Sequence, residues 1–147
     1  MVTDSSTDLR CTCFRLRRAA RKVTQAYDTA LQEAGVSAVQ FALLVEIDRS
    51  APATVNHLAE RLGTDRTTLS RTLTRLSQWG WIVDRQGSDK RAHGFSLTDD
   101  GRRTLFDAGR HWQRAEAAMV RAVGPKGIAQ LYELLEKSEE VGTPPVE

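Results

Sequence analysis

The sequence has 147 residues, is 40% hydrophobic and 27% charged, and carries a formal net charge of +2, as expected for one soluble globular domain. Its longest uncharged stretch, residues 34–45, is far shorter than the roughly 20 residues of a membrane span, and the acidic N-terminus excludes a secretory signal. Two cysteines without further ligand motifs exclude a disulfide framework and a zinc site. We therefore expect a cytoplasmic protein with two thiols, no metal, no cofactor and no membrane partner.

The first predicted helix covers residues 8–35, after a polar and disordered tail at residues 1–7. Apolar residues recur along it every three or four positions, which is the spacing of one helix face. The stretch 10–22 also carries six Arg and Lys residues and no acid. The apolar stripe consists of Leu9, Cys13, Leu16, Ala20, Val23, Tyr27 and Ala30.

Two further helices follow, each with a recognisable start and stop. Ser37 is the predicted N-cap of the first, which stops before Pro52. Thr54 is the predicted N-cap of a short helix that Gly63 ends. The tight turn at residues 63–64 and the helix after it predict a helix-turn-helix.

The helix after this turn begins at an N-cap, Thr64 or Asp65, ends near Gly80, and has an unusual outer face. If its leucines at positions 69, 73 and 76 are buried, hydroxyl and guanidinium groups point outward, with no acid or lysine after Asp65. A solvated helix face would favour Glu, Lys and Gln instead. Short hydroxyl side chains can form hydrogen bonds with phosphates and base edges, and Arg71 or Arg75 can form two hydrogen bonds with guanine. We therefore predict a DNA-recognition helix. Its predicted DNA contacts are Arg66, Thr67, Thr68, Ser70, Arg71, Thr74 and Arg75.

A short hairpin follows, with predicted strands at residues 81–83 and 94–97 and a turn at residues 86–90. Arg85, Lys90 and Arg91 lie around this turn, where basic side chains can enter a minor groove. We expect Asp89 to orient Arg91 rather than to contact DNA, because a carboxylate repels phosphate. An ordinary charged hairpin is the alternative interpretation of this segment.

Two helices complete the chain, one from Thr98 to Gly124 and one containing residues 128–135. The apolar stripes of the first and last helices exceed what a small DNA-binding module can cover, which favours a dimer interface over packing within the chain. A two-fold dimer places two recognition helices about 34 Å apart, one turn of DNA. The predicted division is a winged helix-turn-helix at 36–98, C-terminal dimerisation helices at 99–141 and a tail at 142–147.

The chain resembles the MarR family of transcription regulators over about residues 9–140, because the helix order on both sides of the matching segment, residues 58–102, also fits. The matching text is LAERLGTDRTTLSRTLTRLSQWGWIVDRQGSDKRAHGFSLTDDGR, with Asp89-x-Arg91 and Leu97-Thr98-x-x-Gly101 as its most specific parts. The resemblance implies a mainly α winged helix-turn-helix with a small β-hairpin wing. It also implies a homodimer that binds a palindromic operator as a repressor and is released by a small-molecule inducer or an oxidant. By position, residues 67–75 belong to the recognition helix, and Asp89 and Arg91 to the wing.

Cys11 and Cys13 are possible redox residues. Two positions apart on a helix they would point 200° apart, with Cys13 on the apolar stripe and Cys11 among arginines. The text CFRLRRAAR followed by Tyr27 resembles the peroxide-sensing branch of the family, although Ala38 stands where that branch has a second tyrosine. Two alternatives remain open: Cys13 as a small core residue, and release by an apolar ligand. The aromatic residues Phe41, Trp79 and Trp112 are expected in the core.

Enzymatic function is not predicted, because the sequence has no nucleophile–base pair, phosphate-cradling glycine loop or metal-ligand set. A winged-helix protein-interaction module without DNA binding is the remaining rival class. That class would place acids or apolar groups on the outer face of the recognition helix. Arg71, Thr67 and Thr74 contradict this expectation.

Overall fold

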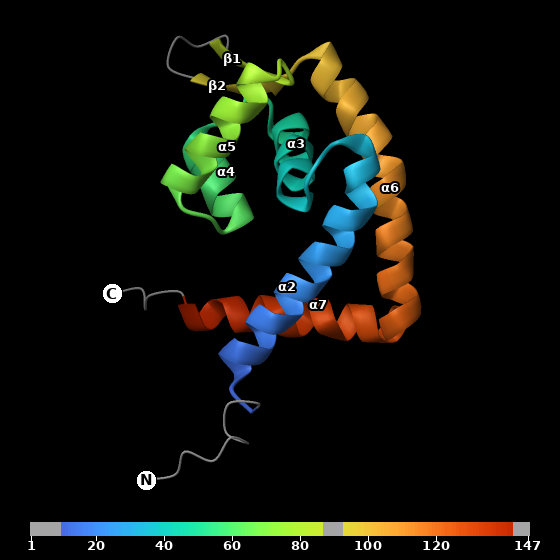
Figure 1. Cartoon of the computed structure of the whole chain (residues 1–147). Helices are drawn as coiled ribbons and strands as arrows, with labels where there is room; N and C mark the ends of the chain where they lie inside the picture. Colours follow the sequence, from blue (N-terminus) through green and yellow to red (C-terminus); the bar gives the residue numbers. More distant parts are fainter. Residues whose placement is uncertain (1–9, 87–92, 143–147) are drawn as a thin grey trace, which may run out of the picture. The chain divides into compact units, whose positions relative to one another are not determined.

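The computed structural model describes residues 10–86 and 93–142 (Figure 1). Within them the predicted element order is confirmed: mainly helical, with one antiparallel hairpin. The chain divides within α6 into two compact units, one ending at Trp112 and one beginning at Gln113. The elements are α2 (Thr12–Leu31), η1 (Gln32–Ala34), α3 (Ala38–Ser50), α4 (Val55–Leu62), α5 (Arg66–Gln78), β1 (Ile82–Gln86), β2 (His93–Leu97), α6 (Asp99–Val123), α7 (Pro125–Glu139) and η2 (Glu140–Gly142).

The local start and stop signals act as predicted. Ser37 forms a capping box with Gln40, each side chain accepting a hydrogen bond from the other residue's backbone N–H. The Thr54 hydroxyl accepts from the backbone N–H of His57 at 3.2 Å. Gly63 ends α4 in the left-handed region with φ +59°, a conformation that favours glycine. These caps fix where α3 and α4 begin and where the chain turns toward α5.

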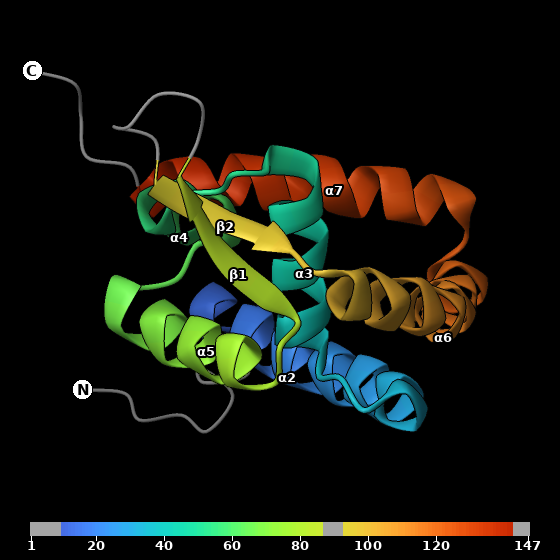
Figure 2. The same cartoon turned by 90° about the horizontal axis from the view of Figure 1, so that it is seen from above.

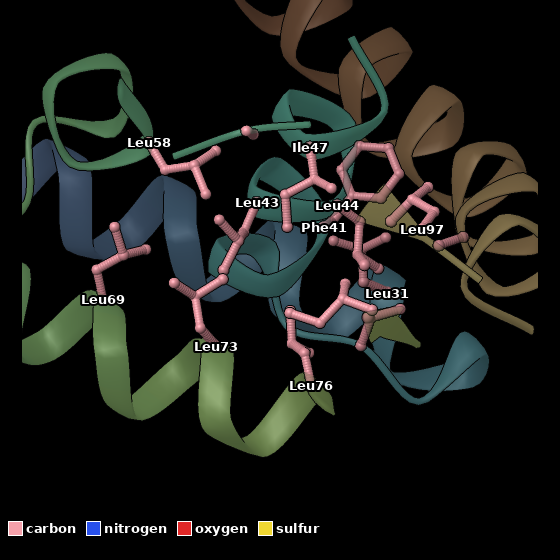
Figure 3. Packing of buried hydrophobic residues seen from close by; sticks show 14 residues of the cluster. Leu31, Phe41, Leu43, Leu44, Ile47, Leu58, Leu69, Leu73, Leu76 and Leu97 are labelled. Atoms are coloured by element: carbon pink, nitrogen blue, oxygen red, sulfur yellow. The ribbon is translucent and has the colours of Figure 1, made fainter. Parts of the chain in front are cut away.

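The core of the first unit lies around α3, which stands between the α4–α5 pair and the first part of α6 in both views (Figures 1 and 2). The predicted stripe of α5 is confirmed, because Leu69, Leu73 and Leu76 are at most 3% exposed. They pack with leucines of the other elements, as Figure 3 shows. The buried leucines and isoleucines of those elements are Leu31, Leu43, Leu44, Ile47, Leu58, Ile82 and Leu97.

The hairpin pairs β1 with β2 from Ile82 opposite Leu97 to Gln86 opposite His93. Ala53, just before α4, adds a short third segment to this sheet. It exchanges two backbone hydrogen bonds with Phe95, at 2.9 Å and 2.8 Å. This bridge ties the start of the helix-turn-helix to the middle of β2, and no local sequence pattern predicted it.

Some element boundaries differ from the prediction. The first helix begins at Thr12 rather than at residue 8, because Cys11 is extended (φ −65°, ψ 118°) and acts as its N-cap; residues 8 and 9 lie outside the described residues. Trp81 is not in a strand, because its backbone N–H bonds to the carbonyl of Leu76 and completes the cap of α5. The first strand therefore starts at Ile82 and extends to Gln86, past the predicted end.

The expectation for Trp79 is also wrong. Its side chain is 46% exposed and tilts against Trp81, with ring centroids 4.8 Å apart. It lies at the end of α5, beyond the buried leucine stripe, so its ring covers Trp81 instead of entering the core. Phe41 and Trp112 do pack in the first unit, with stacked rings 5.9 Å apart.

The start of α6 is fixed by a close approach that requires glycine. Thr98 donates from its hydroxyl to the Gly80 carbonyl at 2.6 Å and accepts from the backbone N–H of Gly101 at 3.0 Å. A Cβ at Gly101 would run into the backbone carbonyl of Trp81.

The variant Gly101→Ala is therefore expected to lower the free energy of unfolding by about 1–3 kcal/mol, the usual cost of overpacking. Urea denaturation followed by circular dichroism measures this change. Gly109→Ala is the matched control on the same helix, because a Cβ there meets no atom within 4 Å. Equal stability of the two variants would contradict the close packing of α6 on the turn after α5.

The second unit contains the end of α6 and α7. The Tyr132 hydroxyl donates to the Glu116 carboxylate at 3.1 Å, which raises the pKa of the tyrosine. No described residue of α7 is buried, and Leu134 is 60% exposed. Over the described part of the chain no single helix is long and apolar enough to cross a membrane; one bent pair, residues 12–34 with 38–50, passes on length and composition alone.

Candidate nucleic-acid interface

The outer face of α5 is free of the protein body. All the residues that the sequence predicted for it are exposed, while the leucines on the opposite side are buried. An open hollow of about 350 Å³ lies on this face. Its lining residues are Arg66, Thr67, Ser70, Arg71 and Thr74, none of them acidic. The hollow therefore offers hydroxyl and guanidinium groups to an incoming partner.

Asp65 caps the N-terminus of α5. Its carboxylate accepts hydrogen bonds from the backbone N–H of Thr68 at 2.8 Å and from the Thr68 hydroxyl at 2.6 Å. These bonds, led by the hydroxyl, hold the pKa of Asp65 below its ordinary value. The carboxylate thus satisfies the helix terminus, and Asp65 is the N-cap rather than Thr64.

The hydroxyls of the outer face differ in what they can still donate. Thr68 donates to Asp65, and Thr74 donates to the Ser70 carbonyl at 2.9 Å. Within the described residues, the Thr67 and Ser70 side chains form no hydrogen bond. Thr67 and Ser70 are therefore available as donors to a partner, whereas Thr68 and Thr74 are already engaged within α5.

The three arginines of α5 have no partner in the described part of the chain. Arg66, Arg71 and Arg75 form no hydrogen bond or ion pair with other described residues. Arginines on α6 behave differently: Arg110, for example, pairs with Asp107 at 2.9 Å. Uncompensated guanidinium groups on one helix face create a positive surface that attracts an anion.

A second hollow adjoins the first and was not predicted. It lies between α5, the start of α4 and β2, has a volume of about 340 Å³, and shares Ser70 and Thr74 with the first. It is lined by Val55, Ser70, Leu73, Thr74, Ser77, Gln78 and Phe95. The periodicity of α5 alone gave no signal for it, because Val55 and Phe95 reach it only through the backbone bridge at Ala53.

The predicted wing is described only at its base. Arg85 is exposed on β1 and pairs across the ladder with Gly94. Asp89, Lys90 and Arg91 lie outside the described residues. The basic tip of the wing therefore stays a prediction, while the hairpin that carries it is confirmed.

The two possible redox cysteines lie at the start of α2, and Tyr27 lies near its end. Cys11 and Cys13 are both free and exposed, and Tyr27 is half-buried. Because Cys11 is the extended N-cap, the predicted 200° separation of two helical positions does not describe this pair. No group of three or more potential metal ligands gathers anywhere in residues 10–86 and 93–142.

Comparison with known proteins identifies this arrangement. The MarR family model matches residues 34–92, which contain α3, the helix-turn-helix and the hairpin. The crystal structure of the M. tuberculosis transcriptional regulator MosR in complex with DNA is 35% identical, covers 89% of this chain and 98% of its own, and superposes with a TM-score of 0.75. The chain belongs to the MarR family.

Two further similar proteins are a transcriptional regulator and a transcriptional repressor by name. The organic hydroperoxide resistance transcriptional regulator of Bacillus subtilis is 32% identical over 90 residues. That match spans 60% of this chain and 61% of the relative, so the chain covers about three fifths of the curated relative's length. The repressor CouR bound to a DNA duplex has a TM-score of 0.82 at 23% identity, covering 95% of this chain and 99% of its own, which supports the fold alone.

Proposed function

We propose that this chain is a transcription regulator that binds a palindromic DNA operator as a homodimer, with the outer face of α5 in the major groove. The observation that carries the proposal is the set of arginines and hydroxyls on α5 that have no partner among the described residues, opposite a buried leucine stripe. Membership in a family of transcription regulators, and a DNA complex of the 35% identical MosR, support it. Such a protein would act in the cytoplasm, where the chromosome is, and would have no enzymatic activity.

Arg71 would contact the DNA bases, and its neighbours on α5 would contact the DNA backbone. Arg71 lines the open hollow, and a guanidinium fits the O6 and N7 acceptors of guanine with two parallel hydrogen bonds. Thr67 and Ser70 keep hydroxyls that can donate to phosphate oxygens or base edges. Arg66, Thr68, Thr74, Arg75, Arg85, Lys90 and Arg91 complete the proposed DNA-binding set, and Asp89 would orient Arg91.

Selection of bound duplexes from a random DNA pool tests this function. We expect enrichment of an inverted repeat whose half-site centres lie about 10 base pairs apart, the separation of two recognition helices in a two-fold dimer. A protein-interaction module on the same fold would enrich no sequence. Recovery of the input pool would therefore overturn the proposed function.

We further propose that the regulator acts as a repressor and that a small ligand or oxidation of a thiol releases it. The hydroperoxide regulator among its relatives and the exposed thiols of Cys11 and Cys13 favour oxidation. In that step a thiol and a hydroperoxide give a sulfenic acid and an alcohol, with the thiol sulfur oxidised and the O–O bond reduced. Tyr27 is the further residue proposed for this site.

An organic hydroperoxide is therefore expected to lower the operator affinity of the wild-type protein by about tenfold or more, within the usual range of regulatory coupling. The double variant Cys11→Ser/Cys13→Ser should keep its affinity under the same treatment. Fluorescence anisotropy with a labelled operator measures both, and the untreated double variant is the control for intact binding. If both proteins are released from the operator to the same extent, thiol oxidation is not the trigger, and a small ligand remains as the proposed one.

A further inference from the structure

A buried carboxylate lies between α3 and α4, apart from the outer face of α5 and from the two cysteines. Glu46 of α3 is 8% exposed. Among the described residues it is the only charged residue that is buried. Three side chains converge on its Oε1 atom. Ser50 Oγ lies at 2.9 Å, His57 Nε2 at 3.1 Å and Arg61 Nε at 3.3 Å.

This cluster keeps Glu46 ionised. Burial raises the pKa of the carboxyl, but hydrogen bonds from Ser50 and His57, together with the Arg61 guanidinium, outweigh burial and hold the pKa below its ordinary value. A buried charge that is paired and fully hydrogen-bonded is tolerated, yet replacing such a cluster by apolar residues is often neutral or stabilising. Stability alone therefore gives no reason for a carboxylate at this place.

The hydrogen-bond donors to Glu46 come from two helices, so the carboxylate links α3 to α4. Ser50 is on α3, the same helix as Glu46, but His57 and Arg61 are on α4, the first helix of the helix-turn-helix. They are four positions apart and so lie on one side of α4. His57 Nε2 is also 3.0 Å from Ser50 Oγ, which ties α4 to the end of α3 a second time.

Helix α4 is short, and much of its packing on the core is partial. It has eight residues, of which Leu58 is fully buried while Val55, Ala59 and Leu62 are half-buried against the core. The hydrophobic effect that holds these side chains is not directional, so it defines the rotation of α4 about its axis less sharply than hydrogen bonds do. Hydrogen bonds from His57 and Arg61 to one fixed oxygen are directional and oppose that rotation.

Rotation of α4 changes the position of α5. Only residues 63–65 separate the two helices, and the backbone N–H of Thr64 bonds back to the Ala59 carbonyl at 3.1 Å. The two helices therefore move together. A rotation of α4 would change the angle at which α5 presents Arg71.

We propose that Glu46 is a positioning residue for DNA recognition: by holding His57 and Arg61 it fixes the rotation of α4 on α3, and through the tight turn it fixes the orientation of α5. This inference rests on the proposed DNA binding. Glu46 would then affect the affinity for the operator sequence and not the affinity for DNA of random sequence. Phosphate contacts tolerate small rotations, whereas bidentate base contacts do not.

The test uses Glu46→Leu, Glu46→Gln and, as matched control on the exposed side of α3, Asp48→Gln. Hydrogen exchange of the α4 amides is measured without DNA, and affinities for the operator and for a random duplex are measured by anisotropy. For Glu46→Leu we expect only a small change in melting temperature, because the half-exposed His57 and Arg61 become hydrated when the carboxylate is removed. We also expect faster exchange in α4 and a 5- to 100-fold loss of operator affinity, the range of regulatory coupling. Its affinity for random DNA should not change.

Glu46→Gln should recover most of the operator affinity, because the amide oxygen still accepts hydrogen bonds from His57 and Arg61. Wild-type exchange in α4 and wild-type operator affinity in Glu46→Leu would overturn the proposal. If Glu46→Leu does not fold, His57→Leu removes one α4 donor from a half-exposed position and is expected to show the same two effects. If the wild-type protein prefers no DNA sequence, the proposed function fails, while faster exchange in α4 of Glu46→Leu would still show that Glu46 holds α4 on α3.

Discussion

Arg71→Ala is expected to abolish sequence-specific DNA binding while leaving the fold intact. The Arg71 side chain is exposed, forms no ion pair with another described residue and lines the open hollow on α5, so its loss removes no internal contact. A bidentate arginine–guanine pair contributes about 1–3 kcal/mol of discrimination, and a two-fold dimer loses it at both half-sites, so operator affinity should fall roughly 30-fold or more.

The measurement is anisotropy with the selected operator and with a random duplex of equal length. Arg110→Ala removes the same charge from α6, where the guanidinium pairs with Asp107, and is the matched control. It should bind the operator as the wild-type protein does, because its positive charge is already compensated. If Arg71→Ala and Arg110→Ala bind the operator equally well, then Arg71 does not read a base.

Leu134→Asp is expected to separate the dimer into monomers and thereby to prevent operator binding. Leu134 is 60% exposed on α7, which buries none of its described residues within the chain. Full burial of one leucine stabilises by about 1.5–3 kcal/mol, and a two-fold interface contains the position twice. An aspartate there would lose this contribution and add the cost of burying a charge.

Analytical ultracentrifugation measures the dissociation of the dimer, and anisotropy measures the parallel loss of operator affinity. Ala129→Asp, which places the same charge on another side of α7, is the control and should stay dimeric. A dimer of unchanged stability in Leu134→Asp would show that α7 does not form the interface. Operator binding by a monomer would contradict the proposed two-fold recognition.

The parts of the fold that depend on neighbouring residues were predictable from the sequence. The caps at Ser37 and Thr54, the turn at Gly63 and the leucine stripe of α5 all act through bonds or periodicity within a few positions, and the structure confirms them. The exposed face of α5 follows from the stripe, since one helix side is buried and the other is not.

The features that were missed depend on residues far apart in the sequence. The Ala53–Phe95 bridge joins segments 42 positions apart and creates the second hollow beside α5. Trp79 was expected in the core because it is large and apolar, but Trp81 provides its packing surface instead. Glu46 directly follows the apolar run 41–45, and its partners on α4 become neighbours only in the folded chain.

Photo-crosslinking of the dimer to an operator that contains 5-bromouracil tests the central claim most directly, because mass spectrometry then identifies the peptide that touches the base edges. We predict crosslinks within residues 66–78, on α5, which disappear when unlabelled operator competes. Crosslinks confined to the basic stretch 10–22, at and just before the start of α2, with none on α5, would contradict the assignment of base recognition to α5.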